Sequence, residues 1–166
     1  YEMTSSLVGS EMCIRDRGLQ TSNDRTAKLI NRCYTLDEYD KTMNNLKRLD
    51  VHVVVHMIIG LPGETKQDMI STVRYIADSG ADGIKLQLLH VLKNTVLEKM
   101  YINGEFDVLT FEEYADILCD CLMELPPDMV VHRFTGDGPK KILVAPMWSA
   151  DKKMVLNRLN RIVSDL

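Results

Sequence analysis

Two mostly apolar runs of strand length, alternating with amphipathic helical patterns, are the feature that most constrains the fold of this chain. The runs are residues 51–59 (VHVVVHMII) and 84–92 (IKLQLLHVL), and such continuous apolarity is typical of parallel strands that are covered on both faces. Residues 36–49 and 66–79 instead repeat apolar side chains at helical spacing. This alternation predicts an α/β fold with a parallel sheet and right-handed crossovers.

Helix start signals support the same alternation, because three threonines each precede an acid by three positions, as in a capping box. The pairs are Thr35 with Glu38, Thr65 with Asp68, and Thr110 with Glu113. The third pair predicts a helix that Pro126 and Pro127 end. Beyond it, residues 129–134 predict one more strand and residues 150–166 a terminal helix.

Composition limits the class of protein. A chain of 166 residues with 45% hydrophobic residues can bury one core, so we expect one domain or part of one. The net charge of -4 argues against wholesale nucleic-acid coating, although a local basic patch remains compatible with it. No apolar run approaches the roughly 20 residues that span a bilayer, and the 4 cysteines lack metal-finger spacing. We therefore expect a cytosolic protein without membrane attachment.

The N-terminal segment, residues 1–17 (YEMTSSLVGSEMCIRDR), shows no hydrophobic period. The string SSLVGSEMCIRDR resembles one that recurs at the ends of unrelated conceptual translations, where sequencing-adapter DNA has been read as protein. We set residues 1–17 aside as a disordered translation artefact and expect the natural protein to begin upstream.

The apolar run at 51–59 ends in Gly60-Leu61-Pro62-Gly63, directly before a predicted helix. In parallel α/β folds, ligands bind at the carboxyl ends of the strands, and glycines there allow positive φ and close approach to bare backbone. A tight turn without a ligand is an equally compatible interpretation of this segment.

Polar residues also interrupt the predicted strands. Gln20 closes the short run GLQT, His56 lies in an aliphatic strand, and Lys85 and Gln87 alternate with leucines. Alternation places Lys85 and Gln87 on the face opposite the leucines, so one face of the sheet is polar. Each residue alone is also compatible with a core position satisfied by backbone, but the set together indicates a ligand site.

The order and spacing of these motifs resemble the second half of a radical S-adenosylmethionine core, in its YhcC-like subgroup, which is related to the Elp3 type. The motifs that carry the resemblance are GLQT (18–21), NRCY (31–34), HMIIGLPGET (56–65), KLQLLHVLKNT (85–95), VLTFEEYADIL (108–118) and MVVHRFTGDGPKKILVAPMWSADKK (129–153). The resemblance covers residues 18–166. It implies the latter part of a partial (β/α) barrel at 18–125, followed by a C-terminal extension at 126–166.

The resemblance implies a chemistry as well. A [4Fe-4S] cluster reduces S-adenosylmethionine and releases a 5'-deoxyadenosyl radical, with electrons from a donor such as flavodoxin or ferredoxin. The Elp3 relationship favours a tRNA nucleoside as the substrate.

The resemblance also implies roles for individual residues. Gln20 would approach the ribose or methionine part of the cofactor, and Arg32, on the helix that follows, would pair with its carboxylate. His56 departs from the acid that related enzymes often use to bind the ribose hydroxyls. The backbone after Gln87 would complete the adenine site. The other residues expected to flank the adenine are Ile58, Gly60, Pro62 and Gly63.

The three cluster cysteines of the family, spaced CxxxCxxC, are absent, since Cys33, Cys119 and Cys121 cannot supply that spacing. Cys121 falls on an apolar helix face, which indicates a core thiol. We therefore expect no metal ligands in this chain, a truncated gene product, and an inactive fragment whose full-length parent binds the cluster.

The loop HRFTGDGPKK suggests a substrate site. It places cations and an acid at or after a strand end, where they could bind an anionic substrate, including RNA phosphate. A solvated charged loop is the competing interpretation. The candidate substrate residues are Lys85, His132, Arg133, Asp137 and Lys140.

Two alternatives from other classes remain compatible with the residues. One is a (β/α)-barrel phosphate-dependent enzyme without iron chemistry, and the other is a noncatalytic nucleotide-binding domain.

Overall fold

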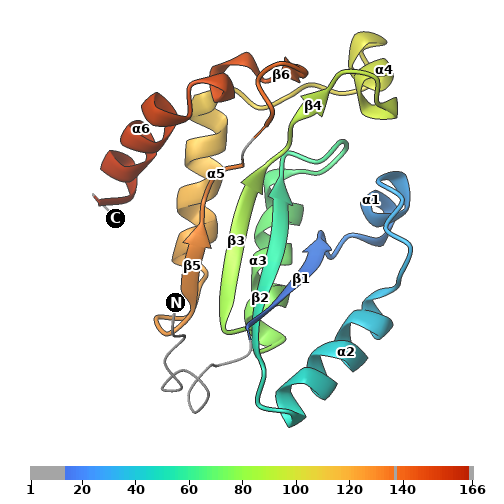
Figure 1. Cartoon of the computed structure of the whole chain (residues 1–166), viewed down its shortest axis with the longest axis vertical. Helices are drawn as coiled ribbons and strands as arrows, with labels where there is room; N and C mark the ends of the chain where they lie inside the picture. Colours follow the sequence, from blue (N-terminus) through green and yellow to red (C-terminus); the bar gives the residue numbers. More distant parts are fainter. Residues whose placement is uncertain (1–13, 137, 165–166) are drawn as a thin grey trace, which may run out of the picture.

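The computed structural model describes residues 14–136 and 138–164 (Figure 1). The strands are β1 (Ile14–Gln20), β2 (His52–Ile59), β3 (Gly83–Leu88), β4 (Val91–Leu92), β5 (Val130–Arg133) and β6 (Leu143–Ala145). The helices are α1 (Asp24–Leu29), α2 (Leu36–Arg48), α3 (Lys66–Asp78), α4 (Val96–Ile102), α5 (Phe111–Met123), the 3-10 helix η2 (Met147–Ala150) and α6 (Lys152–Ser164).

The main sheet is open and parallel, with strand order β1-β2-β3-β5. Each parallel pair is connected through helices, and α3 links β2 to its neighbour β3. The expected parallel α/β architecture is confirmed, and within the described residues the strands do not close into a barrel. The expected boundary at residues 125 and 126 falls between α5 and β5, and β5 continues the same sheet.

Two expected strand boundaries differ from the structure. The run 84–92 is not one strand, because β3 ends at Leu88 and β4 pairs antiparallel with β6 in a second sheet. Just after β3, the Leu89 amide still donates to the carbonyl of Ile59 on β2 at 2.9 Å. Beyond Leu89 the apolar residues continue, but the chain pairs with β6 and no longer with β2. At the other end, β1 begins at Ile14, so residues 14–17 extend the strand that we expected to begin at Gly18. Residues 1–13 lie outside the described part of the chain, and the artefact origin of 1–17 stays a prediction.

The helix start signals are confirmed at all three sites. The side chains of Thr35, Thr65 and Thr110 each accept a hydrogen bond from the backbone amide of the acid three residues later, and each carboxylate accepts one from the backbone amide of its threonine. These reciprocal bonds satisfy amide donors that a helix N-terminus otherwise leaves unpaired. They begin α2, α3 and α5 at positions set by the sequence.

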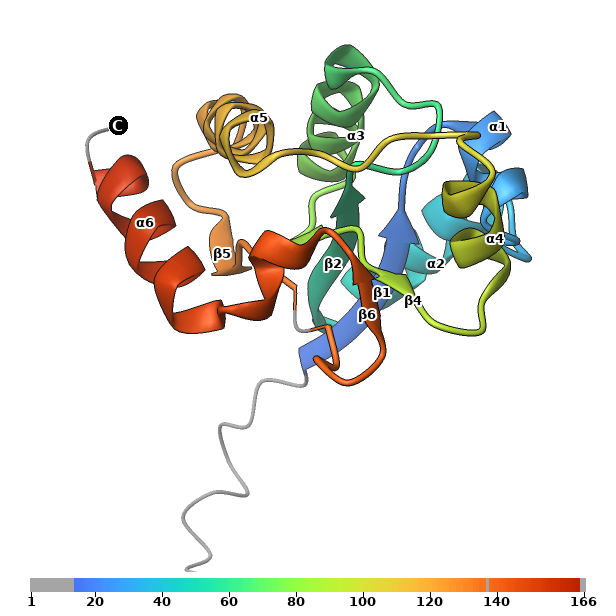
Figure 2. The same ribbon diagram turned by 90° about the horizontal axis from the view of Figure 1, so that it is seen from above.

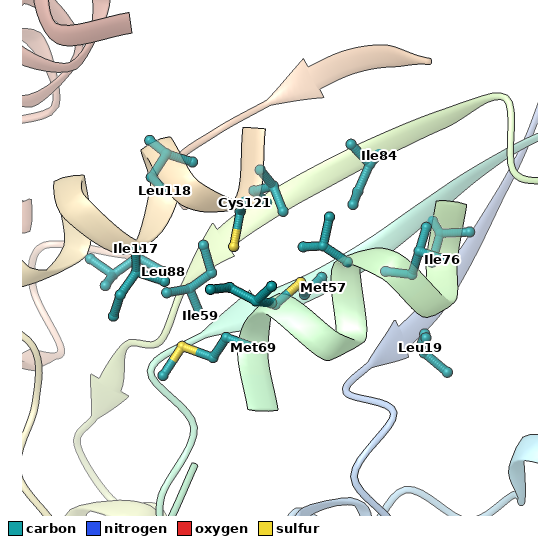
Figure 3. Packing of buried hydrophobic residues seen from close by; sticks show 14 of the residues in the cluster. Leu19, Met57, Ile59, Met69, Ile76, Ile84, Leu88, Ile117, Leu118 and Cys121 are labelled. Atoms are coloured by element: carbon teal, nitrogen blue, oxygen red, sulfur yellow. The ribbon is translucent and has the colours of Figure 1, made fainter. Parts of the chain in front are cut away.

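The core lies between one face of the sheet and the helices α3 and α5, which cover that face in Figure 2. Alternate residues of the central strands supply it, and Figure 3 shows Met57 and Ile59 of β2 among Met69 of α3 and Ile117 of α5. The buried strand residues are Val53, Val55, Met57 and Ile59 of β2 with Ile84, Leu86 and Leu88 of β3. The opposite face carries the half-exposed polar side chains, as the alternation predicts.

Ring contacts attach the C-terminal segment to the core. Trp148 packs edge-on against Phe111 at 5.3 Å between ring centroids, and its Nε1 donates to the carbonyl of Leu109 at 2.9 Å. This residue therefore anchors η2 on α5. Among helices in the described ranges, none is long and apolar enough to cross a membrane.

Candidate functional site

A largely apolar cleft of about 640 Å³, here called the strand-tip cleft, opens at the carboxyl ends of the first strands of the sheet. Gln20 at the tip of β1 and Ile58 near the tip of β2 line it, and Leu89 lines it just after β3. Helices α1 and α4, which lie at the same end of the sheet in Figures 1 and 2, form its sides through Leu29 and Met100. The expected convergence of strand tips on one pocket is therefore present.

Gln20 adopts a conformation that is uncommon for a residue with a side chain, because its φ is 62°. The ladder between β1 and β2 shifts register between Gly18 and Gln20, as in a β-bulge. The Gln20 side chain folds back over Gly18, and with its amide turned for hydrogen bonding its nitrogen donates to the carbonyls of Leu19 (3.0 Å) and Gly18 (3.3 Å). Backbone strain held in place by its surroundings is common at functional sites.

Arg32 is almost fully buried, with 3% of its side chain exposed, and it also lines the strand-tip cleft. Its Nη1 donates to the carbonyls of Leu19 (3.0 Å) and Thr21 (2.5 Å), and its Nε donates to the carbonyl of Tyr34 at 3.1 Å. The third nitrogen, Nη2, is buried without a hydrogen-bond partner and lies 3.8 Å from the carboxylate of Asp24. Arg32 therefore organises the backbone around Gln20, and its Nη2 atom is left without a hydrogen bond.

The residues of the turn after β2 lie in three different surroundings. Leu61 and Pro62 line the strand-tip cleft. Gly60 has a φ of 90°, and a Cβ there would meet the Leu109 side chain at 3.1 Å, so this glycine permits close packing on Leu109 and is not a cleft wall. Gly63, with a φ of 77°, lines a neighbouring hollow of about 480 Å³ together with Arg25.

His56 and Gln87, both expected at the cofactor, lie on the open polar face of the sheet. The Nε2 atom of Gln87 is 3.3 Å from Nδ1 of His56, and Nε2 of His56 is 3.1 Å from the carboxylate of Asp16. Hydrogen bonds from Lys85 and His56 lower the pKa of Asp16 below its usual range. Neither His56 nor Gln87 is a lining residue of the strand-tip cleft, although Leu89, two positions after Gln87, is one.

The expected substrate residues are brought together only in part. Lys85 donates to Asp16 at 2.8 Å and pairs in register with Arg133 across β3 and β5. The His132 ring lies against Gly83, where a Cβ would meet it at 2.7 Å. His132, Arg133 and Lys140 are exposed, with Lys140 in the loop after β5. Asp137 lies outside the described residues.

Glu64 follows the turn after β2 and was not singled out in the sequence. It accepts a hydrogen bond from the hydroxyl of Thr21, at the end of β1. Burial raises the pKa of Glu64 above its usual range, although the hydrogen bond from Thr21 and the nearby hydroxyl of Thr26 oppose that shift. No local pattern could have indicated this pair, since its members are 43 positions apart.

Helix α4 was missed, whereas α1 is the helix expected after the first strand but ends at Leu29, so Arg32 lies beyond it and not on it. Both are short, and α4 has no buried residue. The sequence did contain one signal for α4, because Thr95 precedes Glu98 by three positions and caps its backbone amide at 3.1 Å.

The described residues, 14–136 and 138–164, contain no group of three histidine, cysteine, aspartate or glutamate side chains that could hold a metal ion. Cys33 is exposed, Cys119 is half-buried, and Cys121 is fully buried in the core as expected. The residues of the cleft thus suit an organic ligand with a carboxylate, and the described part of this chain does not by itself fit an iron–sulfur cluster.

Comparison with protein families gives two matches that together cover most of the chain. Residues 17–76 match the family described as the Radical SAM superfamily, and residues 81–164 match the Radical_SAM C-terminal domain.

Individual relatives are similar over part or most of the chain. The chain is 42% identical to YtqA of Bacillus subtilis over 144 residues, which are 87% of this chain and 45% of that protein. It is 29% identical to YhcC of Escherichia coli over 148 residues, 89% of this chain and 48% of that protein. It is 32% identical over 66 residues, 39% of this chain and 15% of the relative, to a tRNA-2-methylthio-N(6)-dimethylallyladenosine synthase of Buchnera aphidicola. The chain thus spans about half the length of YtqA and YhcC.

A solved structure shares the fold. The archaeal Elp3 of Methanocaldococcus infernus with an N-terminal deletion superposes with a TM-score of 0.76 at 21% identity, over 90% of this chain and 36% of that one.

Proposed function

This chain belongs to the radical SAM superfamily, in its YhcC-like subgroup, and we propose that it forms the part of a radical SAM enzyme that holds S-adenosylmethionine in the strand-tip cleft. The observation that carries the proposal is the buried guanidinium of Arg32. Three of its hydrogen bonds order the strand tip, while Nη2 makes no hydrogen bond and has only the exposed carboxylate of Asp24 at 3.8 Å. A buried donor without a partner is costly, so a ligand carboxylate at Nη2 would recover that cost.

The remaining walls suit the other parts of the cofactor. Ile58, Leu61 and Pro62 present an apolar surface for the adenine ring, with Leu89 after Gln87 on the far side. Gln20 offers an amide to the ribose or methionine part. His56 and Gln87 lie on the adjoining polar face, where we assign them to the boundary between cofactor and substrate.

The iron–sulfur cluster of the superfamily is proposed for the complete protein. Its cysteines would come from a part of the protein outside this chain, which spans about half the length of YtqA and YhcC. Together with S-adenosylmethionine the cluster supplies a 5'-deoxyadenosyl radical, with electrons from a flavodoxin- or ferredoxin-type donor. We propose that the present chain, without those cysteines, is inactive, and that its location is the cytosol.

For the substrate we propose a nucleoside of tRNA. The named activity of one relative is a tRNA modification, which supports this class. On this chain, Lys85 of β3 and Arg133 of β5 are register partners, and the His132 ring lies against Gly83 of β3. Lys140 is exposed in the following loop, so these cations could bind phosphate groups of the RNA. Asp137, which lies outside the described residues, is proposed as a substrate residue on the basis of the sequence alone.

Titration of S-adenosylmethionine into the chain, followed by NMR, tests the proposal. Arg32→Ala should weaken binding by about tenfold or more, because a charge-assisted hydrogen bond is lost and the strand tip loosens. Arg48→Ala, which removes an exposed arginine at the end of α2, is the matched control and should leave the affinity unchanged. Equal affinities for the two variants would refute the carboxylate assignment.

A second assay tests the chemistry in the complete reading frame. Reconstituted anaerobically and reduced, the complete protein should cleave S-adenosylmethionine to 5'-deoxyadenosine and methionine. Binding without cleavage would favour a noncatalytic nucleotide-binding domain.

A further inference from the structure

A set of buried and half-buried polar side chains joins the loop after β1 to the turn after β2 and to α3. We call this set the polar clamp, and its members are Thr21, Ser22, Glu64 and Thr72. The Thr21 hydroxyl donates to Glu64 and accepts the Asn23 amide at 2.9 Å. The Ser22 amide and hydroxyl both contact the Thr72 hydroxyl at 3.0 Å. Thr21 and Thr72 are fully buried, so these bonds are shielded from water.

Thr21 occupies the central position in this arrangement. It follows Gln20 directly in the chain, and its carbonyl accepts from Nη1 of Arg32. Its side chain bonds Glu64, which follows the turn containing Leu61 and Pro62. One residue therefore connects both sides of the strand-tip cleft, and the connection depends on the Glu64 carboxyl.

Glu64 is not explained by stability alone. Its second oxygen, Oε2, is buried without a hydrogen-bond partner, which costs free energy, and Asp68 on α3 adds a repelling charge. An energetically unfavourable carboxyl group that is kept beside a cleft suggests that this group positions its neighbours.

We propose that Glu64 is a positioning residue of the cofactor cleft. By accepting the Thr21 hydroxyl it locks the β1–α1 loop to the turn after β2, so that Gln20 and Arg32 face Leu61 and Pro62 at the width the ligand requires. This inference rests on the proposed function, because the ligand is taken to be S-adenosylmethionine.

Three substitutions test the link between Thr21 and Glu64. Thr21→Val and Glu64→Leu each remove one partner of the bond and should each weaken binding of S-adenosylmethionine by about five- to tenfold. The double variant should bind S-adenosylmethionine no more weakly than the single variant with the lower affinity, because both substitutions remove the same interaction. Glu64→Gln keeps an acceptor oxygen and should retain most of the affinity.

Hydrogen exchange of the Ser22 and Asn23 amides provides a readout that needs no ligand. Exchange should be faster in Thr21→Val and Glu64→Leu and near normal in Glu64→Gln. The control is Tyr75→Phe, which removes a 2.6 Å hydrogen bond from α3 to Asp40 on α2, away from the cleft. It should lower the urea midpoint without changing either readout.

The outcomes separate the two proposals. Unchanged affinity and exchange in both Thr21→Val and Glu64→Leu, or additive losses in their combination, would overturn the positioning role. If the unsubstituted chain does not bind S-adenosylmethionine, the proposed function fails. Faster amide exchange in Thr21→Val and Glu64→Leu alone would still support the proposal that the Thr21–Glu64 bond holds the loop to the turn.

Discussion

The guanidinium of Arg32 donates a hydrogen bond to the carbonyl of Leu19 at 3.0 Å, and this bond connects the candidate site with the core. The Leu19 side chain is fully buried, whereas the next residue, Gln20, has a left-handed backbone and faces the strand-tip cleft. The tip of β1 therefore serves both packing and ligand placement. Substitutions there should separate the two effects when folding and binding are measured together.

Gly18→Ala should affect binding more than stability. A Cβ at this position would overlap the terminal amide of Gln20, which is the end of a flexible side chain and can move away. The free energy of unfolding should change by less than about 0.5 kcal/mol. The affinity for S-adenosylmethionine should fall several-fold, because the displaced amide no longer lies at the cleft. A normal affinity in an NMR titration would show that the Gln20 amide does not contribute.

Tyr114→Phe should destabilise the fold by about 1–2 kcal/mol in urea unfolding, because it leaves a carbonyl unpaired. The Tyr114 hydroxyl donates to the carbonyl of Phe134 at 2.9 Å and thereby holds the segment after β5 on α5. Tyr101→Phe is the control, since Tyr101 is half-exposed on α4. A loss of equal size in both variants would contradict the assigned bond.

Glu64 should make the stability depend on pH. Its pKa in the folded chain is raised by burial above the ordinary value of 4.5, so the folded state favours the protonated carboxyl. The resulting stabilisation is present below pH 4.5 and is lost as the pH rises through the folded pKa. As the pH rises from 4.5 through the folded pKa, the urea midpoint of the unsubstituted chain should therefore fall relative to the midpoint of Glu64→Gln. A difference between the two proteins that does not vary with pH would contradict the raised pKa.

The described cysteines should differ in reactivity. Burial raises the pKa of Cys121 to about 12, and its side chain is fully enclosed, whereas Cys33 is exposed. Alkylation by iodoacetamide at pH 8, followed by mass spectrometry, should modify Cys33 quickly. Cys121 should react only after the chain is unfolded in urea. Rapid labelling of Cys121 in the native protein would show that its helix is not packed as described.

Local patterns predicted the parts of the fold that local chemistry determines. The capping boxes at Thr35, Thr65 and Thr110 identified the starts of α2, α3 and α5, because the bonds that form them span three residues. Alternation likewise placed Lys85 on the polar face. The end of β3 at Leu88 was missed because apolar residues continue beyond it while the pairing partner changes to β6.

The candidate site was predictable only where it lies on strands and turns. Gln20, Arg32, Ile58 and Pro62 line the strand-tip cleft as expected. The wall from α4 was missed because this helix has seven residues, too few for a clear apolar period. The contribution of Glu64 depends on a contact across the fold, which no spacing in the sequence reveals.

The most direct test of the account is a crystal structure of this chain with S-adenosylmethionine bound. The account predicts the adenine ring against Ile58, Leu61 and Pro62, and the carboxylate within hydrogen-bond distance of Nη2 of Arg32. A ligand bound elsewhere, or one in this cleft whose carboxylate points away from Arg32, would contradict it.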